Sequence, residues 1–520
     1  MVKRLAPVLL LFSLIGGCAA NHAGPSATSK SASVTAEQLF TVALRPIADN
    51  WLKPVALQQL VGDGLRRVAA ADKALWLVED TDHFVLVRDG KEQARLPMPT
   101  DAMPERWASL TADMLRAMIA ASPTLARKDK EAVYRDMFDG MMADLDPYSR
   151  YAEPNRAQQE RSQREGYDGI GITIREVNGF YEVADLVADG PAAEAGVRQG
   201  ERILAVSGTR TIGIPYETLA SLIQGPDGTS VEMKLGTDEQ RARTLTVKRR
   251  HLVPNTVKAS LENGIAVLRI ERFNNGTQDY VRAALTKAQA SPGGLKGVVM
   301  DLRGNPGGVM VQAVGVVNLF VNQGRIITTR GRHPNSVQWF EAQRSVAAFP
   351  DVPLVVLIDG HTASSAEIVA ASLQDAGRAM LIGTSSFGKG SVQLVSQLPN
   401  GGELFITWSR IYAPSGYSFD LQGVQPNLCI ARPGVTRESL LAAAARPDQG
   451  AQTTLVRQRM AASDDAQALA ALREACPASL PADGGMVTAE TGLSLARSLL
   501  ADTGLYRQAL ASRHINVAER

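Results

Sequence analysis

Ser364 and Lys389 are the two residues whose types and surroundings point most directly to chemistry. Ser364 lies in the stretch 362–367, which is rich in small residues, and Lys389 stands between two glycines in 387–390. A serine hydroxyl is a weak nucleophile at neutral pH unless a positioned base removes its proton. A lysine is such a base only when burial or a cationic neighbour lowers its pKa from about 10.4 towards neutrality. The pair predicts a Ser–Lys hydrolase.

The elements around Ser364 would hold it at a turn between a strand and a helix. The apolar residues 354–358 predict a buried strand, and the apolar run 368–373 predicts a helix. The first turn of a helix has N–H groups without helical partners, and these can face a reacting oxygen.

A second segment has a matching shape. Residues 297–303 predict a short strand that ends in charged residues, and the glycine-rich stretch 304–308 separates it from the helical run 309–320. Tandem glycines let the backbone approach a ligand closely. The expected donors of an oxyanion hole are the backbone N–H groups of Gly307, Gly308 and Ser365.

Three ordered motifs resemble those of the C-terminal processing, or tail-specific, peptidases. They occupy residues 301–308, 362–367 and 387–393, within a resemblance that extends from about residue 130 to about residue 430. The resemblance implies that Ser364 is the nucleophile, that Lys389 is the general base and that Gln393 orients the lysine. It implies no metal or other cofactor. The turn departs from the family's usual pattern at Thr362, Ser365 and Ala366, where Ser, Ala and Ser are common.

Each motif can also be interpreted in another way. Glycine turns after strands are mostly structural, and a serine at a helix start is often an N-cap. Residues 383–389 approach a phosphate-binding loop, but Gly390 stands where the Mg²⁺ ligand should be and a predicted strand follows. Residues 386–389 match the Ser-x-x-Lys of penicillin-recognising enzymes, but that motif opens a helix and the chain has no Lys-Thr-Gly.

A Ser–His–Asp triad also stays open. His361 lies three residues before Ser364, and Asp301 and Asp359 end predicted strands. The other histidines show no metal-ligand spacing; they are His22, His83, His251, His333 and His514.

Residues 166–250 predict a small β-rich module that resembles a PDZ domain. Its order is a strand beginning at 169–172, a second strand at 181–184, a turn and short helix at 190–197, and further strands. A PDZ domain adds a peptide as an extra strand and holds its terminal carboxylate on backbone N–H groups. The resemblance gives that role to Gly169, Ile170, Gly171 and Ile172, whereas the plainer alternative is a generic β-module with glycine turns.

The N-terminus predicts an exported, lipid-anchored protein. Lys3 and Arg4 precede an apolar run, 5–15, that is too short to span a bilayer and is typical of a signal peptide. Residues 15–18 resemble a bacterial lipobox, which implies cleavage after residue 17 and lipidation of Cys18. A cysteine that follows small residues by chance is the alternative. Residues 18–34 would form a flexible tether, and Ala19 favours the outer membrane if the organism is Gram-negative.

The composition fits a chain of several globular domains. Its 520 residues are 45% hydrophobic and 21% charged, and the net charge of +2 gives no reason to expect nucleic acid as a partner. Apart from Cys18 the only cysteines are Cys429 and Cys476, which could pair in an oxidising periplasm. We predict a mixed α/β and α+β protein in which the PDZ-like module precedes an α/β Ser–Lys protease core. The domain boundaries are 35–165 (mixed, then helical), 166–250 (PDZ-like), 251–434 (peptidase core) and 435–520 (Ala-rich and helical).

The predicted function is a serine endopeptidase of the cell envelope. It would face the periplasm, recognise C-terminal tails of protein substrates through the PDZ-like module and cleave with Ser364 and Lys389. The resemblance also allows an adaptor protein and a homo-oligomer as partners. The rival from another class is a noncatalytic PDZ scaffold on the same fold.

Overall fold

The computed structural model describes residues 34–432, 434–446, 451–463, 465–480 and 489–511. The expectations for the signal peptide, for Cys18 and for nearly all of the tether lie outside these residues. Within the described part of the chain, no helix is both long and apolar enough to cross a membrane.

The N-terminal region packs helices around one hydrophobic core beside a small antiparallel sheet of order β1-β2-β3. Its first helix begins at Thr35, whose hydroxyl and N–H are paired with Gln38 in a capping box. Asp129 caps α5 through the N–H groups of Glu131 and Ala132. The elements are α1 (Ala36–Asn50), α2 (Leu57–Ala69), β1 (Leu75–Glu79), β2 (His83–Arg88), β3 (Lys91–Pro97), α3 (Pro104–Ala121), α4 (Pro123–Ala126), α5 (Lys130–Met142), β4 (Arg150–Ala152) and α6 (Pro154–Glu165).

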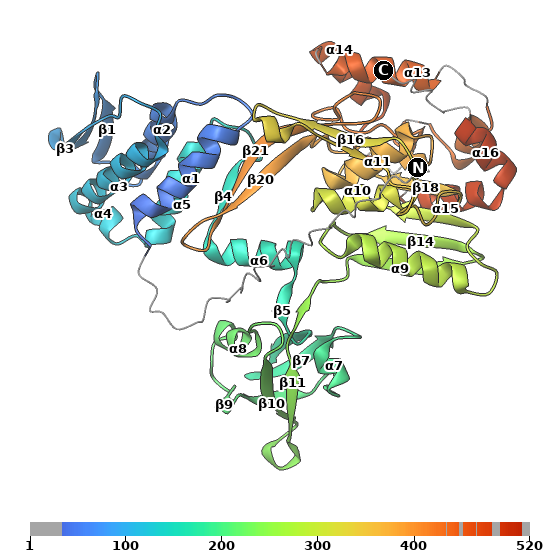
Figure 1. The fold of residues 1–520 in the computed structure, drawn as a ribbon, viewed down its shortest axis with the longest axis horizontal. Helices are drawn as coiled ribbons and strands as arrows, with labels where there is room; N and C mark the ends of the chain where they lie inside the picture. Colours follow the sequence, from blue (N-terminus) through green and yellow to red (C-terminus); the bar gives the residue numbers. More distant parts are fainter. Residues whose placement is uncertain (1–33, 433, 447–450, 464, 481–488, 512–520) are drawn as a thin grey trace, which may run out of the picture.

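Two short paired strands, β5 and β12, connect the PDZ-like module to the rest of the molecule (Figure 1). Its sheet has the order β11-β10-β8-β7-β6. The predicted strand at 169–172 is interrupted, because Ile170 and Gly171 separate β5 from β6 and Gly171 has a φ of +77°. The elements are β5 (Tyr167–Gly169), β6 (Ile172–Val177), β7 (Phe180–Leu186), α7 (Pro191–Glu194), β8 (Arg202–Val206), β9 (Thr209–Arg210), α8 (Tyr216–Ile223), β10 (Ser230–Gly236), η1 (Glu239–Arg241), β11 (Arg243–Lys248) and β12 (Arg250–Leu252).

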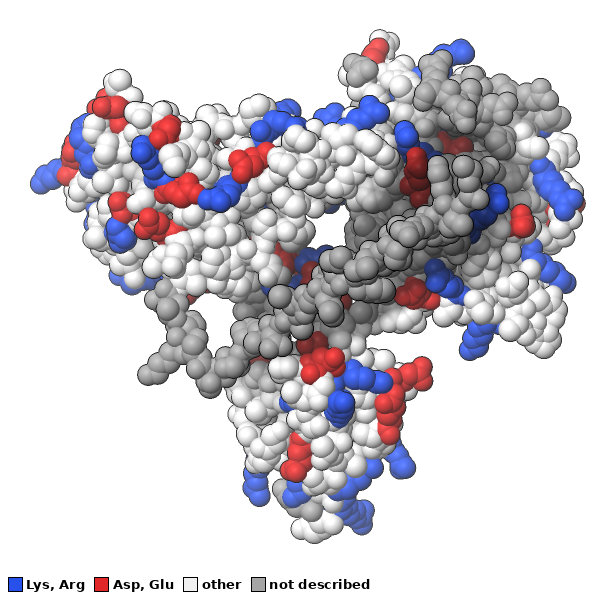
Figure 2. Space-filling view, viewed as in Figure 1, with Lys and Arg blue, Asp and Glu red and all other residues white. Residues whose placement is uncertain are grey.

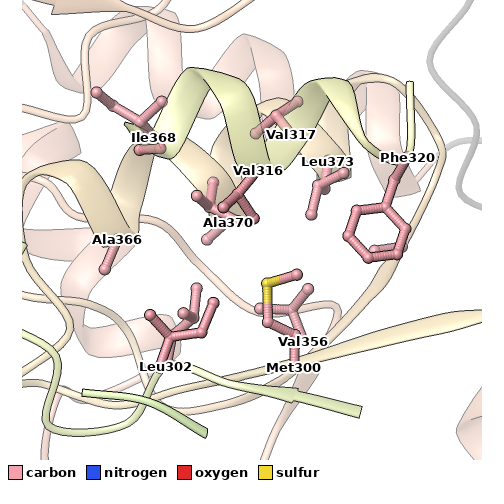
Figure 3. Packing of buried hydrophobic residues seen from close by; sticks show 14 of the residues in the cluster. Met300, Leu302, Val316, Val317, Phe320, Val356, Ala366, Ile368, Ala370 and Leu373 are labelled. Atoms are coloured by element: carbon pink, nitrogen blue, oxygen red, sulfur yellow. The ribbon is translucent and has the colours of Figure 1, made fainter. Parts of the chain in front are cut away.

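The core is a three-layer α/β unit built on a sheet of order β13-β14-β15-β18-β19-β22. All neighbours except β13 and β14 are parallel. Helices α9, α10 and α11 cover one face, where Met300 and Val356 of the sheet meet Val316 and Ala370 of the helices (Figure 3). Helices α12, α15 and α16 cover the other face. The elements are β13 (Val257–Glu262), β14 (Ile265–Ile270), α9 (Thr277–Ala290), β15 (Gly297–Asp301), α10 (Met310–Asn318), β18 (Leu354–Ile358), α11 (Ser365–Asp375), β19 (Met380–Gly383), β22 (Leu428–Cys429), α12 (Arg437–Ala444), α13 (Ala451–Ala462), α14 (Ala466–Ala475), α15 (Ala489–Ala501) and α16 (Thr503–Ala511).

A second sheet joins the core to the N-terminal region (Figure 1). Its order is β17-β16-β21-β20, and β4 pairs with β21. Leu398, Leu404 and Ile406 from the β20–β21 hairpin are buried in the core of the N-terminal region. The hairpin that follows Lys389 therefore packs against the N-terminal region. The elements are β16 (Arg325–Arg330), η2 (Pro334–Ser336), β17 (Gln338–Glu341), β20 (Ser391–Gln397) and β21 (Glu403–Tyr412).

Positive and negative side chains are interspersed on the face drawn in Figure 2. In the same view an opening lies between the N-terminal region and the core, above the PDZ-like module.

Candidate active site

The turn that carries Ser364 is strained and held in place by its neighbours. Ser364 lies between β18 and α11 with φ 53° and ψ −116°, a conformation that L-residues other than glycine rarely adopt. Asp359 Oδ1 accepts the N–H groups of His361 and Thr362 at 3.0 Å and that of Gly304 at 3.0 Å. One carboxylate at the end of β18 thus fixes both the nucleophile turn and the glycine-rich loop after β15.

The glycine-rich loop lies directly against Ser364. A Cβ on Gly307 would stand 2.8 Å from the Cβ of Ser364 and 3.0 Å from the amide nitrogen of Ser365. The φ of Gly307 is +99°, so a side chain is excluded both by space and by conformation. The N–H of Gly307 donates to Asn305 Oδ1 at 2.8 Å, whereas no described residue accepts a hydrogen bond from the N–H of Gly308.

Glu367 links the two halves of the site, and the sequence analysis gave it no role. Its Oε2 accepts the N–H groups of Ser364 and Lys389, each at 2.8 Å. Its Oε1 accepts the N–H of Gly388 at 2.7 Å and the hydroxyl of Ser386. The side chain is fully buried, and burial raises the pKa of Glu367 to about 7 although these four hydrogen bonds favour the carboxylate. The available signal was a glutamate at the third position of a helix whose N-cap is serine.

Lys389 lies in surroundings that favour its neutral form. Burial and the nearby Arg150 lower the pKa of Lys389, while Asp146 and Glu367 oppose the shift. Its Nζ stands 4.7 Å from the centroid of the Tyr148 ring. Tyr148 belongs to the segment between α5 and β4, so the N-terminal region contributes directly to the surroundings of the lysine.

Gln393 does not contact Lys389 by a described hydrogen bond. Its Nε2 donates to Ser391 Oγ at 3.0 Å and to Thr407 Oγ1 at 3.3 Å. Thr407 Oγ1 in turn donates to Asp146 Oδ1 at 2.7 Å. Asp146 Oδ2 accepts from the indole of Trp51 at 3.0 Å, so a chain of polar contacts runs from β20 into the N-terminal region.

The residues of the alternative triad have structural partners. Asp301 forms ion pairs with Arg303 at 2.7 Å and with Arg269 at 3.3 Å. The described hydrogen bond from His361 to Asp359 comes from its backbone N–H, and the side chain of His361 is exposed. Among the described residues no group of three or more His, Cys, Asp or Glu side chains could hold a metal ion.

Two other predicted features are the peptide-tail loop of the PDZ-like module and a disulfide. Ile170 and Gly171 form the loop between β5 and β6, and β6 is an edge strand of the module. Cys429 of β22 and Cys476 form a disulfide with Cα atoms 5.9 Å apart.

Comparison with known proteins identifies the family of this chain. The model for peptidase family S41 matches residues 264–430, and a PDZ-domain model matches residues 182–235. A carboxy-terminal-processing protease of Bartonella bacilliformis is 35% identical over 311 residues, which are 59% of this chain and 71% of that protein. This chain belongs to peptidase family S41.

Two further proteins are similar to this chain. The carboxy-terminal processing protease CtpA of Bacillus subtilis is 29% identical over 305 residues, 58% of this chain and 65% of the relative. Among solved structures, a photosystem II D1 C-terminal processing protease is similar at 25% identity with a TM-score of 0.38, over 76% of this chain and 93% of that one. The S41 chain is thus a carboxy-terminal processing serine protease with a PDZ domain. The predictions of a protease core of the C-terminal processing type, a PDZ domain and a mixed α/β architecture are confirmed.

Proposed function

We propose that this S41 peptidase cleaves peptide bonds by means of a Ser364–Lys389 catalytic dyad. The observation that carries the proposal is the carboxylate of Glu367, which accepts N–H groups of both residues at 2.8 Å. Two N–H groups bonded to one oxygen lie close together, so the backbones of the proposed nucleophile and base share one anchor. Burial lowers the pKa of Lys389, which favours the neutral form that a general base requires.

We propose the following sequence of steps for this dyad. Neutral Lys389 takes the proton from the Ser364 hydroxyl as the oxygen attacks the carbonyl carbon of the substrate. The N–H groups of Ser365 and Gly308 receive the developing oxyanion, because that of Gly307 is already bonded to Asn305. The lysine gives its proton to the leaving amine, which leaves an acyl-enzyme on Ser364. A water molecule then attacks the acyl carbon as it gives a proton to the same lysine. The lysine passes that proton to Ser364 Oγ as the acyl bond breaks and the new C-terminus is released.

We propose that the PDZ domain selects the substrate by its C-terminal tail. The amides of Ile170 and Gly171 donate to no described residue, and the adjoining strand β6 has a free edge. These are the two features with which a PDZ domain binds a carboxylate and adds a strand.

We also propose that the S41 protease is attached to the cell envelope through a lipid on Cys18 and faces the periplasm. The support is the pattern of residues 3–18 alone. Mass spectrometry of the mature N-terminus tests it, and an unmodified Cys18 in membrane fractions would contradict it.

The dyad is tested by replacing each member. Ser364→Ala and Lys389→Ala should each lower kcat by roughly three orders of magnitude or more, and the double variant should lose little further activity because the two act as a unit. His361→Ala is the matched control and should keep its activity. Hydrolysis of a tailed peptide, with circular dichroism to confirm folding, measures the effect. Full activity in Lys389→Ala together with loss in His361→Ala would move the base to histidine.

A further inference from the structure

A short C-terminal segment, residues 473–478, lies against the loop that carries Lys389. Ser385 Oγ donates to the carbonyl oxygen of Cys476 at 2.6 Å, and Thr384 Oγ1 donates to that of Ala478 at 2.9 Å. Both hydroxyl-bearing residues are buried. The start of the lysine loop is therefore fixed by backbone from a region outside the span of the family match.

Arg473 extends these contacts to the end of the loop nearest the lysine. Its Nη1 donates to the carbonyl oxygen of Leu421 at 2.7 Å, and its Nη2 lies 3.5 Å from that of Phe387. Leu421 has a positive φ of 63° and donates its N–H to the carbonyl oxygen of Gly388 at 2.9 Å. A bulky residue keeps such a conformation only where its surroundings enforce it.

The segment also touches the turn that leads to Ser364. A Cβ on Gly360 would collide with the carbonyl oxygen of Ala478. Residues 473–478 thus contact both the lysine loop and the turn that leads to Ser364.

A disulfide fastens this segment to the central sheet. Cys476 is bonded to Cys429, the last residue of β22, which pairs with β19. The lysine loop begins directly after β19. Arg432 adds one hydrogen bond from its Nε to the carbonyl oxygen of Ala475 at 2.9 Å.

We propose that residues 473–478 form a positioning element for the Lys389 loop, and that the Cys429–Cys476 disulfide makes turnover depend on redox state. The proposal rests on the Ser364–Lys389 dyad proposed above. With the disulfide intact, the loop is held and the enzyme is active. A dithiol reductant transfers two electrons and two protons: the S–S bond breaks, Cys429 and Cys476 become thiols, and the reductant becomes a disulfide. The segment then loses its cross-link, and the lysine loop loosens.

Loosening should change the chemical step and leave tail binding unaffected. The PDZ domain lies at the other end of the molecule from helix α14, which ends one residue before Cys476 (Figure 1). Water entering around a loosened loop would reduce the burial that lowers the pKa of Lys389. The rising limb of kcat against pH should therefore move to higher pH. The titratable and charged groups near the lysine are Glu367, Asp146, Tyr148, Arg150 and Asp420.

The experiment compares the oxidised enzyme, the enzyme reduced with dithiothreitol, Cys429→Ala/Cys476→Ala and Arg473→Gln. Arg497→Gln, in α15 and in an exposed ion pair with Glu262, is the matched control. Reduction and both variants should lower kcat on the order of ten- to a hundredfold, as expected for a misplaced catalytic group. The KM should stay within about twofold, since ground-state binding is intact. The pH limb should move upwards, and amides 384–390 should exchange hydrogen faster in mass spectrometry. The double cysteine variant should not respond further to the reductant.

Three results would overturn the inference. The first is an unchanged kcat, pH limb and amide exchange on reduction and in Arg473→Gln. The second is a fall in kcat without movement of the limb or of exchange at 384–390, because that pattern reports only a smaller folded fraction. The third is two free thiols beyond Cys18 when the denatured, unreduced protein is labelled.

If the double cysteine variant does not fold, Arg473→Gln decides the question with the disulfide intact. A failure of the dyad itself is distinguishable, because Lys389→Ala would then stay active whatever the redox state.

Discussion

The carboxyl group of Glu367 is fully buried, and its protonation is coupled to folding. Its pKa of about 7 in the folded chain exceeds the ordinary value of 4.5. Between these two values the folded chain binds a proton that the unfolded chain releases. The group's contribution to stability is therefore complete below about pH 4.5 and is lost as the pH rises through 7.

We expect this coupling to disappear in Glu367→Gln. The free energy of unfolding of the wild type, relative to that of the variant, should fall by roughly 3 kcal/mol between pH 4.5 and pH 8. Urea titrations across this range measure it. The variant should also lose activity, because a glutamine amide group meets N–H donors where a carboxylate oxygen accepted them. Parallel pH profiles of stability for the two proteins would refute the burial argument.

Tyr148 provides a second prediction at the level of single residues. If Lys389 must be neutral to act, activity rises with pH along a limb set by its lowered pKa. The Tyr148 ring beneath the Nζ favours the ammonium form. Tyr148→Leu should therefore move the limb to lower pH by about half a unit, and Tyr148→Phe, which keeps the ring, should leave it in place. A limb that moves equally in both variants would exclude the ring as the cause.

Helix α6 of the N-terminal region contacts the β20–β21 hairpin and leads into the PDZ domain. Arg164 near its end donates to the fully buried carboxylate of Glu403 at 3.0 and 3.3 Å, and Arg161 adds a contact at 3.3 Å. Glu403 begins β21, and Gly166 after the helix leads into the PDZ domain. The helix therefore ties the base of the PDZ domain to the hairpin that carries Gln393.

Arg164→Ala tests this connection. It should lower the free energy of unfolding by about 3 kcal/mol, because a buried carboxylate then keeps only part of its pairing. Arg156→Ala is a matched control on the same helix, since Arg156 pairs with Glu160 at the surface, and should cost less than about 1 kcal/mol. Chemical denaturation measures both. Similar losses in the two variants would mean that Glu403 does not depend on this arginine.

The arrangement of the whole molecule bears on how a substrate is chosen. The PDZ domain is joined to the rest of the molecule through β5 and β12, and it stands apart from the protease core (Figure 1). Between these two strands, Nδ1 of His251 lies 2.7 Å from Oδ1 of Asp168. On the proposed function, the tail is therefore selected in one unit of the enzyme and the chain is cleaved in another.

Amidation of the substrate's C-terminus tests tail selection. Charge-assisted hydrogen bonds contribute about 1.5–3 kcal/mol each, so loss of the terminal charge should weaken binding roughly tenfold or more. Isothermal titration with Ser364→Ala protein measures binding without cleavage, and the free-acid peptide is the control. Equal affinity for both peptides would leave a protease that does not read the terminal carboxylate.

The sequence by itself determined the local elements and the family. Apolar runs predicted β15, β18 and α11. The strand after Lys389 was also predicted correctly, and it argued against a phosphate-binding loop. These features depend on residues adjacent in the chain. The three motifs identified the protease type for the same reason.

Only the tertiary structure decided which groups meet. Glu367 as the shared anchor, the bond of Gly307 to Asn305, and the chain from Gln393 through Thr407 to Asp146 all involve choices of partner that no periodicity encodes. The contacts of residues 476 and 478 with the lysine loop gave no signal in the sequence, because they are made by backbone carbonyl oxygens that every residue possesses. Periodicity reports whether a residue is buried, whereas the identity of its partner depends on how distant segments pack.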